Sequence, residues 1–131
     1  MRRIFLIALA VALTGSLGVA AKAQAETVNG MAEVGILQPV TKVEGKEVVT
    51  TIKVKNLSRG TIVGLKVDEY WYDKDGNPLP GDSEKLKQPL APGAVSTILL
   101  RTPVNPKMDR NNYVFAHDNG KVHTTVFARL E

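Results

Sequence analysis

Apolar and polar side chains alternate along most of the chain after residue 30. The pattern is clearest at residues 46–56, where the set Val48, Thr50, Ile52 and Val54 alternates with the set Thr51, Lys53 and Lys55. Successive side chains of a β-strand point to opposite faces of the sheet. This period of two therefore predicts a strand with one buried face and one solvated face.

Further segments with this pattern are separated by clusters of Pro, Gly, Asn and Asp, which favour turns. No window after the first 25 residues has the apolar spacing of an amphipathic helix. Asn119-Gly120 is typical of a hairpin turn. Six or seven short strands joined by turns predict an all-β fold, an antiparallel immunoglobulin-like β-sandwich. We expect these strands at residues 31–40, 46–56, 61–73, 84–88, 94–102, 112–117 and 121–130. Pro39 is expected to end the first strand or to place it at a sheet edge.

The first 25 residues have the composition of a secretory signal peptide. Arg2 and Arg3 precede the apolar run Ile4–Leu13, and Ala23-Gln24-Ala25 matches the small-residue pattern of a cleavage site. A retained membrane anchor is the alternative, but a spanning helix needs roughly 20 apolar residues and this run is shorter. We therefore expect an exported protein of bacterial type, periplasmic or extracellular, in which residues 26–131 form a single domain.

The basic character of the chain resides mainly in this leader. The whole sequence has 17 Lys and Arg against 13 Asp and Glu, a net charge of +4. Arg2, Arg3 and Lys22 leave with the leader, so 14 basic and 13 acidic residues remain, a net charge of +1. A nucleic-acid-binding domain carries a strongly basic surface, so we expect no nucleic-acid partner.

The residue types present limit the chemistry of the chain. It contains no Cys, which excludes disulfides, thiolate metal sites and Cys nucleophiles. The sequence has neither a Gly-rich phosphate loop nor a nucleophile elbow. We therefore expect no cofactor and no catalytic residues.

The segment DEYWYDKDGN, residues 68–77, contains the only Trp and two of the three Tyr. In strand phase, Trp71 falls on the apolar face with Val63, Leu65 and Val67, and we expect it to anchor the core. Ile62, Gly64, Lys66, Asp68, Tyr70 and Tyr72 fall on the other face. Lys66, Tyr70 and Tyr72 there are either packed against a neighbouring strand or part of a surface for a ligand or partner.

Glu69 lies on the apolar face of this predicted strand. A buried carboxylate costs several kcal/mol unless it is paired or solvated. A β-bulge that turns Glu69 outward and a salt bridge are two structural explanations, and a functional acid is the third. The sequence places no second carboxylate beside Glu69, so it predicts no general acid–base pair.

Two further groups of residues are candidates for metal binding. Asp73, Asp75, Asn77 and Asp82 carry oxygen ligands suited to Ca²⁺, although Asp-Gly-Asn is equally typical of a reverse turn. His117 and His123 are the only histidines. A two-residue turn at Asn119-Gly120 would place the imidazoles on opposite sides of the hairpin, which argues against a zinc pair.

Three segments in a fixed order resemble the FxLYD-type domain of bacterial extracytoplasmic proteins. They are KVKNLSRGTIVGLKV, then WYDKDGN, then QPLAPGAVSTILL. The resemblance as a whole runs from Lys53 to about Val122, which is about two thirds of residues 26–131. The sequence departs from the family pattern at Glu69, where the family name implies Phe, and at Trp71, where it implies Leu. The resemblance implies an immunoglobulin-like β-sandwich outside the cytoplasm. It implies no shared reaction and no catalytic residues.

Two functional hypotheses follow. The first is a non-enzymatic immunoglobulin-like module that binds another envelope or secreted protein, with strand addition at an exposed edge as the mode of contact. The second is a module that binds glycan or Ca²⁺ through Tyr70, Tyr72 and the loop Asp73–Asp82. An enzyme is a third and weaker hypothesis, because it requires Glu69, Asp68 and a histidine to converge.

Overall fold

The computed structural model describes residues 25–131, and the predicted leader up to residue 24 lies outside the described residues. The described residues are all-β, without a helix, and therefore contain no helix that is long and apolar enough to cross a membrane. The strands are β1 (Ala32–Leu37), β2 (Val40–Glu44), β3 (Glu47–Asn56), β4 (Lys66–Tyr72), β5 (Pro78–Leu79), β6 (Ser83–Lys85), β7 (Val95–Pro103), β8 (Arg110–His117) and β9 (Gly120–Phe127).

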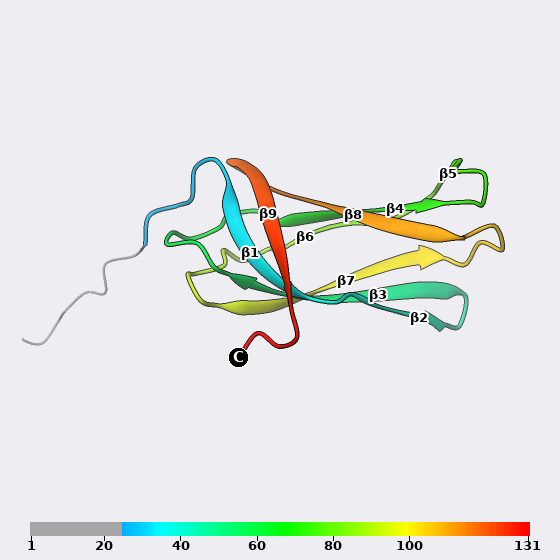
Figure 1. Ribbon diagram of the computed structural model, residues 1–131, viewed down its shortest axis with the longest axis horizontal. Coiled ribbons are helices and arrows are strands. Elements are labelled where there is room, and N and C mark those ends of the chain that lie inside the picture. The colour runs from blue at the N-terminus through cyan, green and yellow to red at the C-terminus, as the bar shows by residue number, and fades with distance from the viewer. Residues whose placement is uncertain (1–24) are drawn as a thin grey trace, which may run out of the picture.

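These strands form one curled, mixed sheet. Its order is β2-β3-β1-β9-β8-β4-β5, with β7 on the free side of β3 and β6 on β4. In Figure 1, β4 and β8 run above β7, β3 and β2 along the long axis of the molecule. The hydrogen bond from the Thr50 side chain of β3 to the Glu69 side chain of β4 shows that these two strands face each other inside the curl.

The prediction of a purely antiparallel fold of six or seven strands is wrong, because β1 and β9 are parallel over Ala32–Leu37 and Val122–Phe127. β9 pairs with β8 only near the hairpin turn and then crosses to β1, as the adjacent ribbons of β1 and β9 in Figure 1 show. Gly35 accommodates this crossing. A Cβ atom there would come within 3.0 Å of the Phe127 ring, so the absence of a side chain lets the ring lie against β1.

The single strand expected at residues 31–40 is two strands. β1 ends at Leu37, and β2 begins after Pro39. Proline has a fixed φ and no N–H, which interrupts a ladder. The break lets β1 pair with the C-terminal part of β3 while β2 pairs with its N-terminal part.

The strand expected at residues 61–73 begins only at Lys66. Gly64 has a φ of +68°, a left-handed conformation that ends regular pairing before β4. The side-chain phase therefore changes at this point. Ile62 is fully buried and Val63 is only partly buried, the reverse of the predicted faces. From Leu65 onward the predicted faces are correct.

The core lies between the inward faces of the curled sheet. Val67 of β4, Ile52 and Val54 of β3 and Leu100 of β7 are fully buried in it. These positions confirm the predicted apolar face of residues 46–56. The same inward faces also carry polar residues, and these form the candidate site.

Candidate functional site

Glu69 lies in the middle of β4 with its side chain directed into the core. Only 3% of its surface is exposed. It stands between Val67 and Trp71 on the buried face, as the sequence phase predicts. The pairing of β4 with β8 is continuous through Glu69, opposite Tyr113, so no bulge turns the side chain outward.

Three neutral side chains satisfy the Glu69 carboxyl group. The Thr50 hydroxyl of β3 donates to Oε2 at 2.8 Å, and the Asn111 amide of β8 donates to the same oxygen at 3.2 Å. The Thr102 hydroxyl of β7 donates to Oε1 at a longer 3.4 Å. None of the ion pairs among residues 25–131 includes Glu69. Both structural explanations predicted for Glu69, a bulge and a salt bridge, are therefore wrong. Hydroxyl and amide donors from three other strands satisfy its carboxyl group instead.

This polar cluster extends toward the protein surface in two directions. Thr41 of β2 bonds Thr50 through their hydroxyls at 3.1 Å. Because Thr50 donates its proton to Glu69, Thr41 acts as the donor to Thr50. On the other side, the Asn111 amide also donates to the Tyr113 hydroxyl at 2.9 Å. We call these six residues the Glu69 cluster: Thr41, Thr50, Glu69, Thr102, Asn111 and Tyr113.

Trp71 is buried, as the sequence predicts for a core anchor. Its indole N–H has no hydrogen-bond partner among the described residues. A buried indole usually finds an acceptor, so this group is an unsatisfied donor two residues from Glu69. Trp71 pairs with Asn111 across the β4–β8 ladder, but Asn111 directs its amide to Glu69 and Tyr113.

The opposite face of β4 carries Lys66, Tyr70 and Tyr72, the residues for which the sequence predicts either cross-strand packing or a ligand or partner surface. Tyr70 is 43% exposed, and Tyr72 is partly buried beneath the Arg110 guanidinium, 5.7 Å above its ring. Lys66 forms an ion pair of 3.5 Å with Asp68. Arg110 lies directly opposite Tyr72 on β8, so the ring takes part in the cross-strand packing that was one of the two predicted roles.

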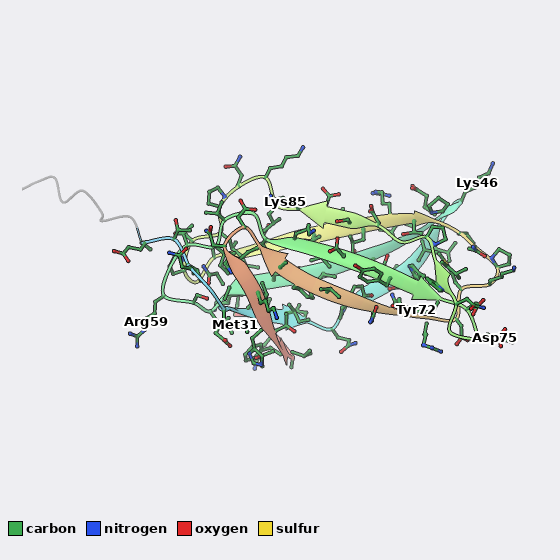
Figure 2. The ribbon with its side chains drawn as sticks, turned by 90° about the horizontal axis from the view of Figure 1, so that it is seen from above. Met31, Lys46, Arg59, Tyr72, Asp75 and Lys85 are labelled. Carbon is green, nitrogen blue, oxygen red and sulfur yellow. The ribbon has the colours of Figure 1, made fainter. Side chains whose placement is uncertain are left out.

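The loop after β4 is a hairpin turn organised by Asp73. Its Oδ1 accepts the backbone N–H groups of Asp75 at 2.9 Å and Asn77 at 2.8 Å, and its Oδ2 accepts the Asn77 amide at 3.1 Å. These bonds, chiefly that from the Asn77 backbone, hold the pKa of Asp73 below its ordinary value. Gly76 at φ +82° completes the turn. Figure 2 shows Tyr72 and Asp75 at the end of the molecule opposite Met31 and Arg59.

The four candidate calcium ligands are divided between two structural roles. Asp73, Asp75 and Asn77 form the hairpin turn. Asp82 instead accepts the backbone N–H groups of Ser83 and Arg101, at 2.8 and 2.7 Å. In the part of the chain that the structure describes, no three His, Asp or Glu side chains are grouped to hold a metal ion.

The two histidines are also separated. His117 is buried, and its Nε2 lies 2.6 Å from the Gly30 carbonyl, while its Nδ1 accepts the Asn119 N–H. Nε2 therefore carries the proton that is donated to Gly30. His123 is exposed and bonds Glu33 at 2.7 Å. The tight turn between β8 and β9 is Asp118-Asn119, one residue before the predicted position, because His117 pairs with Gly120.

A groove of about 640 Å³ runs along the free edge of β7. β7 pairs with β3 on one side only, and β6 with the segment that follows it forms the opposite wall. We call this feature the β7 groove and define it by its lining residues: Asp82, Glu84, Lys85, Leu86, Lys87, Gln88, Pro89, Leu90, Ala94, Val95, Ser96, Thr97, Ile98, Leu99 and Arg101.

The backbone of β7 offers unpaired groups to this groove. The Arg101 N–H points to the groove side, where Asp82 accepts it. Successive residues of a strand direct their backbone groups to alternate edges. The N–H and C=O groups of Val95, Thr97 and Leu99 therefore also face the groove. No sequence motif marks this edge, because the pattern of β7 shows which face is buried and not which edge is paired.

No protein-family model matches this sequence, and the comparisons with curated proteins and with solved structures return no match.

Proposed function

We propose that this protein is an exported, non-enzymatic immunoglobulin-like module that binds an extended segment of another protein along the β7 groove. The free edge of β7 is the observation that carries the proposal. It combines unpaired backbone groups with apolar side chains at Val95 and Leu99, which is 42% exposed. A peptide that adds a strand to a sheet gains main-chain hydrogen bonds of this kind.

The immunoglobulin-like part of the proposal is supported by the two groups of strands that face each other. β2, β3 and β7 pair in one group, and β8, β4 and β6 pair in the other. Their buried faces meet at Glu69, which bonds Thr50, Thr102 and Asn111. The resemblance to FxLYD-type domains points to the same fold and to a location outside the cytoplasm.

The non-enzymatic part rests on what surrounds the buried carboxyl group. Thr50, Thr102 and Asn111 are neutral donors, and neither histidine contacts Glu69. A general base needs a reactive proton within hydrogen-bond reach, and 3% exposure leaves little of Glu69 open to a substrate. The Glu69 cluster therefore serves the fold that presents the β7 edge.

The test is selection of binding peptides on the folded protein. A display library of random peptides is panned on the immobilised chain, and the enriched peptides are assayed against two variants. Thr97→Pro removes a backbone donor from the free edge without breaking a bond to β3, and Thr97→Val makes a similar side-chain change but keeps the N–H. We expect binding to be lost in the first variant and retained in the second.

Two results would overturn the proposal. One is a selection that yields no peptide with saturable binding. The other is a set of peptides that bind Thr97→Pro as well as they bind the original protein. Circular dichroism of both variants verifies that the sheet is intact. Export is tested separately by expression in a bacterial host and N-terminal sequencing, with Glu26 expected as the first residue of the exported protein.

A further inference from the structure

Two charged side chains in the β7 groove make no ion pair among residues 25–131. They are Glu84 and Lys87, both exposed. The other charges of the groove are already engaged. Lys85 pairs with Asp118 at 2.7 Å, and both Asp82 oxygens accept backbone N–H groups. The Arg101 guanidinium lies 3.7 Å from Glu47 and 4.0 Å from Glu44. The groove therefore presents one unpaired anion and one unpaired cation.

The unpaired charges lie toward opposite ends of the groove. Asp82 bonds the Arg101 backbone, which fixes the start of the β6 wall beside the C-terminal part of β7. Leu90, at the other end of that wall, accepts the Asn56 amide, and the Asn56 N–H donates to the Ala94 carbonyl just before β7. The wall thus runs antiparallel to β7. Glu84 lies toward Leu99 and Lys87 lies toward Val95.

Glu84 points into the groove rather than across the outer surface. It pairs with Val67, whose side chain is fully buried, so the two side chains share the inward face of the sheet. Inward-pointing charges on an edge strand discourage pairing with an arbitrary apolar strand. A partner strand with a basic side chain beside Glu84 would pair with this carboxylate and would so avoid the cost of burying an unpaired charge.

The strand phase of β7 also sets the pattern of a bound segment. Residues opposite Val95, Thr97 and Leu99 would direct their side chains outward. Residues opposite Ser96 and Ile98 would direct theirs inward, against the apolar wall at Leu86. An added strand therefore needs apolar residues at the inward positions opposite Ser96 and Ile98. Its charged residues belong at the next inward position on either side of these two.

We propose that the β7 groove selects an extended partner segment by charge and direction. The segment runs antiparallel to β7, has a basic residue at the Glu84 end and an acidic residue at the Lys87 end, and carries inward-facing apolar residues between them. This inference rests on the proposed function and specifies the partner's chemistry. Antiparallel pairing is the more stable arrangement of a two-strand ladder.

The test uses two peptides of identical composition, Lys-Thr-Val-Thr-Val-Thr-Glu and Glu-Thr-Val-Thr-Val-Thr-Lys, blocked at both ends. Only the first places Lys beside Glu84 when it pairs antiparallel to β7. We expect its dissociation constant to be at least about threefold lower than that of the second peptide, because each of the two exposed ion pairs contributes a small binding free energy. Titrations followed by amide chemical shifts of Val95, Thr97 and Leu99 give both the affinity and the location.

The matched variant exchanges the two charges of the groove, Glu84→Lys together with Lys87→Glu. Net charge and composition are unchanged, and we expect the preference between the peptides to reverse. A second double variant, Lys74→Asp with Asp75→Lys, exchanges two exposed charges of the hairpin turn outside the groove and is expected to keep the original preference. If the peptide preference reverses in the first double variant and not in the second, the charges of Glu84 and Lys87 determine which peptide binds.

The outcomes separate the two proposals. If both peptides bind at β7 with equal affinity, or if the charge exchange leaves the preference unchanged, charge selection is wrong and strand addition remains. If the selected library peptides also fail to bind, the proposed function itself is wrong. A preference for the reversed peptide in the original protein would overturn the antiparallel direction.

Discussion

Glu69 and Asp73 are two carboxyl groups four positions apart, and the structure uses them in opposite ways. Glu69 is buried and accepts donors from β3, β7 and β8, all distant in the sequence. Asp73 is only partly buried, and it accepts donors only from its own loop, at Asp75 and Asn77. One carboxyl group connects strands across the core, and the other organises a turn of five residues.

The comparison shows that the surroundings decide what a carboxyl group does for the fold. A bond within the loop stabilises the local conformation and leaves the core unaffected when it is lost. A bond across the core satisfies groups that have no access to water, and its loss leaves several buried donors unpaired at once. We therefore expect the two sites to respond very differently to the same amide substitution.

The largest effect is expected for Glu69→Gln. The new amide group would place a donor among the donors of Thr50, Thr102 and Asn111. Leaving a buried donor unsatisfied costs about 1–3 kcal/mol, and we expect a loss of this size in the free energy of unfolding. Urea denaturation measures it. Glu84→Gln, the same change at an exposed position, is the control and should lie within about 0.5 kcal/mol of the original protein.

An intermediate effect is expected for Thr50→Val. Valine keeps the shape but removes the hydroxyl that bonds both Glu69 and Thr41. We expect a loss of about 1–2 kcal/mol in the free energy of unfolding. The same change at exposed Thr97 provides the comparison in the same urea assay. Equal stability of the two variants would show that the Glu69 cluster contributes little to folding.

The smallest effect is expected at Asp73, where the response is local. Because its pKa is lowered in the folded protein, the stabilisation is present above the ordinary value of about 3.8 and is lost as the pH falls through the lower folded pKa. We expect the protection factors of the Asp75 and Asn77 amides, which are exchange rates relative to the intrinsic rate at the same pH, to fall on acidification. Asp73→Asn should show low protection factors at these two amides at all pH values, with an unchanged urea midpoint. A large drop in the midpoint would contradict the distinction between the two carboxyl groups.

Much of the Glu69 site could be predicted from the sequence, but not its partners. The period of two placed Glu69 and Trp71 on the buried face, and it placed Thr50 on the buried face of β3. The sequence could not show that Thr50, Thr102 and Asn111 converge on one carboxyl group, because convergence depends on how the sheet curls. The Asp73 turn, by contrast, is encoded in adjacent residues and was among the predicted alternatives.

The remaining differences have the same cause. β9 pairs with β1 because it separates from β8 soon after the hairpin turn. The alternation of apolar and polar residues in β9 does not show where this separation occurs. The change of phase at Gly64 was missed because a single glycine inside an apolar run does not reveal its φ angle. The free edge of β7 was also hidden, since the sequence gives the faces of a strand but not its neighbours.

The bond from the Arg101 N–H to Asp82 also has a consequence for solubility. This bond engages the backbone at one end of the free edge of β7. A second sheet could therefore pair with β7 only along the residues that precede Arg101. We therefore expect this bond to hinder stacking of one molecule on another through β7, which would be the first step toward a fibril. Asp82→Ala would release that backbone donor, and we expect the protein to become prone to self-assembly on concentration.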